Sequence, residues 1–152
     1  MPNTCQHPCP CQMQQSNPKS YDDCCQPYHQ GAKVPDYESL MRSRFSAFVL
    51  GLGDYLAQTW HSSTRPVDLR SEPDSQWRKL EIIGAAGDQV HFKAYSQDQN
   101  GFTCMEEVSN FVEEDGRKVY VDGEVSIKPH TPQRNEFCLC GSGKKYKKCC
   151  DK

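Results

Sequence analysis

The chain has 152 residues, a net charge of −2 and an apolar fraction of 36%, which leaves room for one modest core with small appendages. No apolar run approaches the ~20 residues that a membrane-spanning helix needs, and residues 1–30 are polar throughout. The composition therefore excludes a membrane span. The polar start, without the pattern of a signal peptide, predicts a cytoplasmic protein whose thiols stay reduced.

The ten cysteines gather at the two ends of the chain. Nine lie in residues 5–25 and 138–150, and only Cys104 lies between them. A disulfide framework would more naturally cross-link the middle, whereas clustered thiols in a reducing compartment usually bind metal. We interpret Cys104 as a small buried strand residue rather than as a nucleophile.

Residues 1–32 are expected to form an N-terminal zinc knuckle. Two cysteine pairs, separated by twelve residues with a predicted turn at Asn17-Pro18, supply the expected ligands Cys9, Cys11, Cys24 and Cys25. Cys5 and His7 are additional donors that could replace one of these four. The arrangement repeats, with a longer gap, the pattern at the other end of the chain.

Residues 33–131 carry the pattern of an α+β domain. Asp36 is a suitable N-cap for a helix whose apolar face holds Met41, Phe45, Phe48 and Leu52, and residues 55–60 predict a second short helix. Alternating residues then predict four strands over residues 77–84, 89–96, 102–113 and 117–124. Asp115-Gly116 is the strongest hairpin signal. Helices followed by an antiparallel meander define the α+β class, with the first helix covering one face of the sheet.

Five residues of this middle domain stand out as candidates for a pocket: Arg42, Arg44, Trp60, His61 and Asp122. The two arginines could bind an anion, and His61 could act as a general base. Alternatively, the arginines pair with strand carboxylates such as Glu106 or Glu107, and His61 caps the short helix. No catalytic triad, carboxylate pair or phosphate loop is visible, so enzymatic activity stays an open question.

Residues 132–152 are expected to form a C-terminal zinc knuckle. Its two cysteine pairs, separated by eight residues, supply the ligands Cys138, Cys140, Cys149 and Cys150. Gly141-Ser142-Gly143 provides the turn, because glycine adopts positive φ without a Cβ clash, and residues 144–148 suit a helical turn. A disulfide pair or a basic tail with incidental cysteines are the alternatives. With both knuckles filled, the chain would hold about two Zn²⁺ ions.

Residues 134–150 resemble the SEC-C motif, known as the zinc-binding tail of the SecA translocation ATPase. The resemblance rests on Cys138-Leu-Cys-Gly-Ser-Gly-Lys-Lys-Tyr-Lys-Lys-Cys149. SecA tails usually end in Cys-His where this chain has Cys-Cys, so Cys150 is carried over as a ligand by position. The resemblance implies a protein partner, either a SecB-like chaperone or the translation or export machinery, because the SecA tail engages the SecB chaperone.

Over the whole chain the sequence is similar to the YchJ family. The similarity rests on three stretches together with the terminal knuckle: residues 40–48, 54–61 and 120–123. Membership implies two SEC-C motifs that flank a middle domain similar to nuclear transport factor two, with a cystatin-like cone fold. Such a cone has a curved sheet wrapped on a long helix and a pocket at its open end.

Charge is distributed unevenly along the chain. From Arg134 onward six basic and two acidic residues give +4, which leaves −6 for the rest. The C-terminal knuckle has four lysines: Lys144, Lys145, Lys147 and Lys148. These lysines either contact an anionic partner or balance the negative charge of the thiolates. Three functional hypotheses follow: a zinc-binding adaptor that contacts a protein, a small-molecule binder or enzyme that uses the cone's pocket, and ribosome or nucleic-acid contact. We also expect the middle domain to fold without metal.

Overall fold

The computed structural model describes residues 8–15, 17–67, 69, 74 and 76–151. Helical segments come first and strands follow, which confirms the α+β class. In chain order the elements are η1 (Pro10–Gln12), η2 (Tyr21–Asp23), α1 (Gln26–His29), α2 (Tyr37–Leu50), α3 (Gly53–Gln58), β1 (Trp77–Ala86), β2 (Gln89–Asp98), β3 (Gly101–Glu114), β4 (Arg117–His130) and η3 (Tyr146–Lys148). Cys5 and His7 lie outside the described residues.

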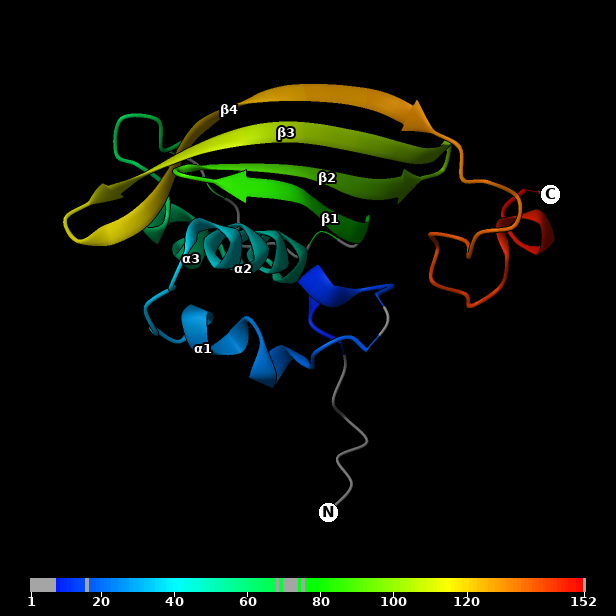
Figure 1. Cartoon of the computed structure of the whole chain (residues 1–152), viewed down its shortest axis with the longest axis horizontal. Coiled ribbons are helices and arrows are strands. Elements are labelled where there is room, and N and C mark those ends of the chain that lie inside the picture. Colours follow the sequence, from blue (N-terminus) through cyan, green and yellow to red (C-terminus); the bar gives the residue numbers. More distant parts are fainter. Residues whose placement is uncertain (1–7, 16, 68, 70–73, 75, 152) are drawn as a thin grey trace, which may run out of the picture.

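The four strands form one antiparallel sheet in the order β1-β2-β3-β4, which curves over α2 (Figure 1). The predicted hairpin between β3 and β4 is confirmed, with φ of 55° at Asp115 and 77° at Gly116. β4 continues to His130, past the predicted end at residue 124, because its backbone stays paired with β3 as far as Phe102. These last β4 residues are mostly exposed, so the sequence has no pattern of buried residues there that would predict a strand.

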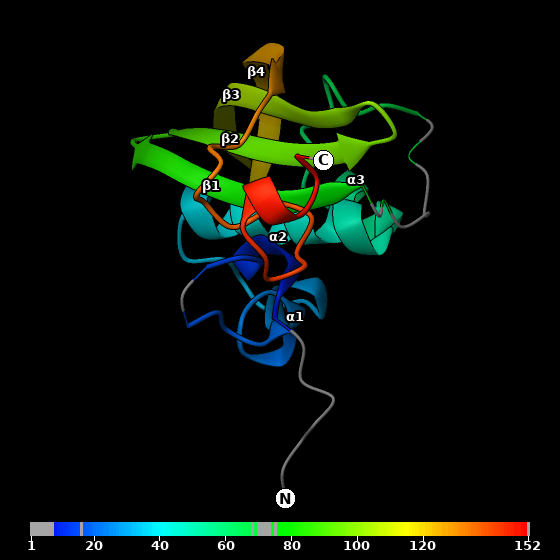
Figure 2. The same ribbon diagram turned by 90° about the vertical axis from the view of Figure 1, so that its right-hand side faces the viewer.

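Helix α2 lies between two layers and is buried on both sides. Asp36 caps it as predicted, because its carboxylate accepts a hydrogen bond from the Ser39 N–H at 2.7 Å. Phe45 faces the sheet, with its ring 5.8 Å from that of Trp77, while Ser46 contacts the N-terminal segment. The sequence predicted one apolar face only; the second face is lined by small residues because a third layer packs closely there (Figure 2).

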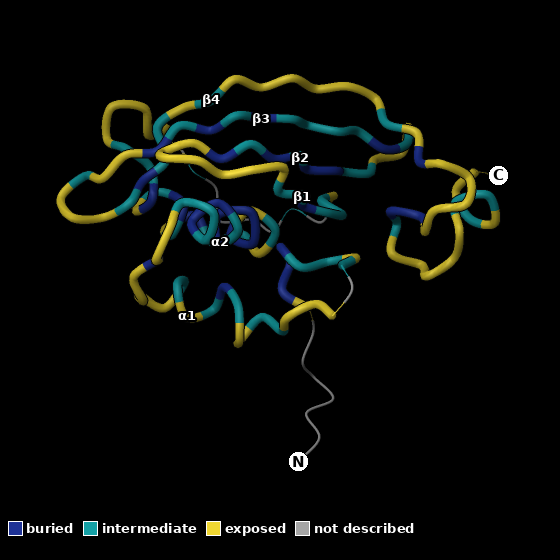
Figure 3. The backbone as a smooth tube through the Cα atoms, viewed as in Figure 1, coloured by how far each residue is buried: buried dark blue, intermediate teal, exposed yellow. Residues whose placement is uncertain are grey.

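The two ends of the chain are packed differently. Cys9, Cys11 and Cys25 belong to the main hydrophobic core, together with α2 and the sheet. A second, smaller cluster joins the C-terminal end to strand residues; its buried members are Tyr95, Phe102, Cys138 and Leu139. The N-terminal segment thus continues the core, and the C-terminal segment lies at one end of the sheet (Figure 3). Within the described part of the chain, no helix has the length and apolar character needed to cross a membrane.

Candidate metal centres

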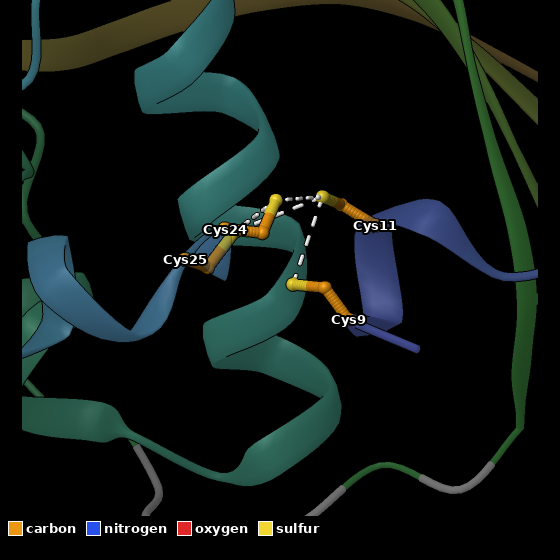
Figure 4. A group of neighbouring side chains, drawn as sticks. All are labelled: Cys9, Cys11, Cys24 and Cys25. Atoms are coloured by element: carbon orange, nitrogen blue, oxygen red, sulfur yellow. Dashed lines mark hydrogen bonds between the residues drawn. The ribbon is translucent and has the colours of Figure 1, made fainter. Parts of the chain in front are cut away.

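Four thiols converge in the N-terminal segment, with Cys9 and Cys11 around η1 and Cys24 and Cys25 after η2 (Figure 4). Cys11 Sγ lies 3.8 Å from Cys9 Sγ, 3.5 Å from Cys24 Sγ and 3.7 Å from Cys25 Sγ. All four sulfur atoms lie within 4.8 Å of one another. A tetrahedron of sulfurs about 2.3 Å from Zn²⁺ has edges of about 3.8 Å, so this donor set fits such an ion.

The ionisation of these thiols is coupled. Contact with Cys11 lowers the pKa of Cys9 far below its usual range and raises the pKa of Cys25 far above it. Four adjacent thiolates repel one another, so the cluster holds four negative sulfurs only when a cation compensates them. The four thiols that the sequence singled out could therefore hold a cation.

Ser46 on α2 connects this cluster to the middle domain. Its hydroxyl donates to Cys25 Sγ at 3.3 Å, lies 3.3 Å from Cys9 Sγ, and accepts a hydrogen bond from the Cys11 N–H at 3.2 Å. Ser46 is completely buried. It therefore holds three of the four candidate ligand residues from outside the cluster, a contact that the sequence analysis missed.

A second set of four thiols lies at the C-terminus, and its sulfur atoms also lie within 4.8 Å of one another: Cys138, Cys140, Cys149 and Cys150. Cys149 Sγ is 3.5 Å from Cys140 Sγ and 3.9 Å from Cys150 Sγ. A hydrogen bond from Ser142 lowers the pKa of Cys140 to about 6, which favours its thiolate form. Gly141 and Gly143 adopt φ of 88° and 83°, so the predicted glycine turn is present.

Neither cluster contains a disulfide, since all nine cysteines of the described residues are free. The sulfur–sulfur separations also exceed the bond length of about 2.05 Å by more than one ångström. The donor chemistry of both sets, four soft thiolates at tetrahedral spacing, suits Zn²⁺. Both clusters could therefore hold a metal ion.

The two knuckles share one backbone scaffold. The N–H of Cys9 donates to the carbonyl of Lys19 at 2.8 Å, and the N–H of Cys138 donates to the carbonyl of Lys144 at the same distance. In each knuckle a 3₁₀ turn that begins with tyrosine then leads to the Cys-Cys pair. The N-terminal segment thus has the same backbone arrangement as the C-terminal one, despite its longer connection.

Equivalent positions in the two scaffolds carry opposite charges. After the tyrosine, the N-terminal knuckle has Asp22 and Asp23, whereas the C-terminal knuckle has Lys147 and Lys148. Three of the four candidate lysines are exposed, and Lys147 is half-buried. No ion pair joins any of the four to a described residue; the salt bridge in this knuckle links Arg134 to Asp151 at 3.4 Å.

The five candidate pocket residues lie in different surroundings. Arg44 and Trp60 line a cavity between α2 and the sheet. Arg42 instead pairs with Glu38 at 3.1 Å and donates to the Cys11 carbonyl at 3.4 Å, on the side of the N-terminal knuckle. Neither arginine forms an ion pair with Glu106 or Glu107.

His61 and Asp122 are not among the residues that line this cavity. His61 accepts a hydrogen bond from the Ser63 N–H at 3.0 Å, and its Nε2 lies 3.5 Å from the Glu114 carboxylate. Asp122 is exposed and accepts a hydrogen bond from Asn110 at 2.9 Å. Cys104 is half-buried and packs beside the C-terminal knuckle, and burial raises the pKa of its thiol.

Two family models match the chain. Residues 36–123 match the YchJ middle domain of the nuclear-transport-factor-two-like type, and residues 134–151 match the SEC-C motif. The chain therefore belongs to the YchJ family, and its middle domain has the fold that the resemblance implied.

Curated relatives extend the match to nearly the whole chain. A UPF0225 protein of Vibrio parahaemolyticus is 40% identical, with 93% of this chain and 97% of the relative aligned. A UPF0225 protein of Vibrio cholerae is 41% identical over 88% and 95%, and one of Bordetella pertussis is 43% identical over 77% and 92%. No solved structure matches the chain.

Proposed function

We propose that the chain is a two-zinc adaptor of the cytoplasm. In this proposal the N-terminal metal fixes its knuckle to the middle domain, and the C-terminal knuckle contacts an acidic protein partner. The geometry of both thiol sets supports the choice of Zn²⁺, because the sulfur separations of 3.5–3.9 Å match the edge of a ZnS₄ tetrahedron.

The observation that carries the partner-binding role is the exposure of the C-terminal lysines. Lys144, Lys145 and Lys148 are exposed, and no described acid pairs with them. Exposed cations on a small rigid module steer an anionic partner toward it. The resemblance to the SecA tail favours a protein partner of the SecB type. The net charge of −6 on the rest of the chain disfavours nucleic acid.

Elemental analysis of protein prepared without added metal tests the metal content. We expect about two zinc ions per chain, and a value below one would contradict both sites. Binding of a purified SecB-type chaperone to the intact protein and to Cys140→Ser tests the contact. The variant should lose one zinc and the binding while it keeps the thermal transition of the intact protein. Equal binding by both proteins would exclude the C-terminal knuckle as the contact, and binding that nuclease abolishes would indicate nucleic acid instead.

A further inference from the structure

A cavity of about 310 Å³ lies between α2 and the concave face of the sheet, and none of the clustered cysteines lines it. Its walls are mainly apolar and aromatic, including Phe45, Phe92, Met105 and Trp77. Phe48, which also lines it, keeps 38% of its surface exposed, so the cavity opens beside this residue. Its size falls at the lower end of the range for small-molecule sites, about 300–1,000 Å³.

Two charged side chains line this apolar cavity, and both are buried. Arg44 is 3% exposed and Glu107 is 7% exposed, yet they form no ion pair within 4 Å among the described residues. Buried charges in proteins are normally paired with each other or fully hydrogen-bonded. Packing alone therefore does not explain why these two charged side chains line one cavity without contacting each other.

Arg44 is held in place by neutral groups. Its Nη1 donates to the carbonyls of Leu56 and Thr59 at 3.1 and 3.0 Å, and to the Thr59 hydroxyl at 2.7 Å. The guanidinium carbon lies 4.8 Å from the ring centroids of both Trp60 and Tyr120. Burial lowers the pKa of Arg44 to about 10, so the group is still a cation at neutral pH.

Glu107 is held by two hydroxyls that bind the same oxygen. Tyr120 donates to Oε2 at 2.8 Å and Ser109 donates to Oε2 at 3.0 Å, while no described residue bonds to Oε1. Among the described residues, the one fully buried side-chain nitrogen or oxygen without a partner is Trp60 Nε1. Oε1 is therefore not sealed off by protein, and because Glu107 lines the cavity, this oxygen is available there as an acceptor.

The opposite strand leaves room for this carboxylate. A Cβ atom at Gly123 on β4 would overlap the carboxylate of Glu107. Gly123 therefore allows the side chain to lie across the sheet toward Tyr120, which keeps its proton because burial and the bond to Glu107 raise its pKa above the usual range.

We propose that this cavity binds a small, uncharged, flat aromatic compound that bears a hydroxyl group. The aromatic walls suit the ring, and the free oxygen of Glu107 accepts a hydrogen bond from the hydroxyl group of the compound. Arg44 and Glu107 together give the lining no net charge, so a neutral compound enters without an uncompensated charge. This binding site is independent of the role proposed for the knuckles.

The probe is 2-naphthol, added to the zinc-loaded full chain, with 2-methoxynaphthalene as a matched compound that lacks the donor. The chain has two tryptophans, Trp60 and Trp77, and both line the cavity, so their two indole N–H signals in a ¹⁵N NMR spectrum report binding directly. Trp60→Phe and Trp77→Phe assign the two signals. We expect 2-naphthol to shift both signals and to bind about tenfold or more tightly than the methyl ether.

Glu107→Gln should remove most of this preference while binding of the methyl ether stays the same. Glu106→Gln is the control, because Glu106 points to the other face of the sheet and pairs with His91 at 2.6 Å. Met105→Trp, which fills the cavity and leaves both charges in place, should abolish binding of both probes. Unshifted indole signals at millimolar 2-naphthol, equal affinities for the two probes, or full binding by Met105→Trp would each overturn the proposal.

Discussion

The two knuckles of this protein have the same donors and the same backbone scaffold in opposite surroundings. In the N-terminal knuckle Cys9, Cys11 and Cys25 are at most 1% exposed and form part of the main core. Of the four cysteines of the C-terminal knuckle, Cys138 is the one that is buried, and Cys150 is exposed. Since the local motif is shared, these differences come from what packs against it. We infer that one knuckle has become a structural layer of the fold, whereas the other is presented at its surface.

The buried and the exposed knuckle also differ in the charge of the residues beside their thiols. The buried knuckle carries Asp22 and Asp23 beside its thiols, although acidic neighbours disfavour thiolates. The exposed knuckle has lysines at the equivalent positions, Lys147 and Lys148. If lysines were needed for a thiolate cluster of this scaffold, the N-terminal one would need them as well. The comparison therefore favours a role for the lysines outside metal binding.

Removal of one candidate ligand from each knuckle should reveal the difference between the two knuckles most clearly. Cys25→Ser should destabilise the whole protein by about 3 kcal/mol or more, because it would release the proposed metal ion, whose candidate ligands belong to the main core. This corresponds to a fall in Tm of roughly 10 °C for a chain of this size. Cys149→Ser should lower Tm by less than about 2 °C.

Scanning calorimetry and elemental analysis on both variants test this prediction. Each variant should lose one metal ion, so the stability difference reports on burial and not on stoichiometry. Equal shifts in Tm would show that burial does not distinguish the sites. That the middle domain folds without metal stays a prediction; the shared core adds the expectation that an ion at the N-terminal site contributes to its stability.

Ser46→Ala should weaken the N-terminal site alone. The change leaves the buried Cys11 N–H without its acceptor and removes the contacts to two ligand sulfurs. We expect a loss of about 1–3 kcal/mol in stability and of about 10- to 100-fold in metal affinity at this site. Competition with a chelator measures the affinity.

Ser43→Ala is the matched control for this variant. Ser43 is also buried on α2, but its hydroxyl bonds to the Leu40 carbonyl and to Tyr55, away from the thiols. It should lower stability without changing metal release. Faster metal release from Ser43→Ala than from Ser46→Ala would assign the effect to general loosening of α2.

The sequence predicted those features that depend on local spacing. Both thiol sets, the N-cap at Asp36 and the hairpin at Asp115-Gly116 follow from residues close together in the chain, and the structure has all of them. The contact of Ser46 with the thiols could not be found this way, because Ser46 and Cys9 lie 37 positions apart in the sequence. A buried serine in a helix has no local signature until the third layer is known.

The lining of the cavity was also only partly predictable from local sequence patterns. Arg44 and Trp60 line the cavity, but His61, which follows the β-bridge between Trp60 and Tyr120, lies beside Glu114 instead. Glu107 was considered only as a partner for arginine. Its position in phase with the inward-facing Met105 and Ser109 on β3 was the signal that could have identified it.

The charge difference between the knuckles can be tested directly. Lys147→Gln combined with Lys148→Gln should weaken binding of an acidic partner by about 0.5–1 kcal/mol per lysine and flatten its salt dependence. Metal content should stay the same. Asp22→Asn combined with Asp23→Asn, the equivalent positions in the other knuckle, is the control and should leave partner binding intact.

The outcome separates two roles for the lysines. If they mainly stabilise thiolates, the lysine variant should lose metal affinity and keep its salt dependence of binding. Titrating metal and partner on the same preparation distinguishes these results.

The smallest effect concerns the link between the knuckles. Gln14 Nε2 donates to the Leu139 carbonyl of the C-terminal knuckle at 2.6 Å and to the Arg78 carbonyl of β1 at 2.9 Å. Gln14 has φ of 64°, so Gln14→Gly removes the side chain without straining the backbone. The free energy of unfolding should change by less than about 1 kcal/mol.

Hydrogen exchange is the sensitive measurement here, because a local contact changes local opening more than global stability. Amides of residues 138–150 should exchange several-fold faster in Gln14→Gly, while those of the N-terminal knuckle keep their rates. Gln15→Ala is the control, since the Gln15 side chain donates to the Leu80 carbonyl of β1, at 3.4 Å, and not to the C-terminal knuckle. Unchanged exchange at residues 138–150 would mean that packing on Tyr95 and Phe102 alone holds the C-terminal knuckle, and that the two knuckles respond independently to a partner or to loss of metal.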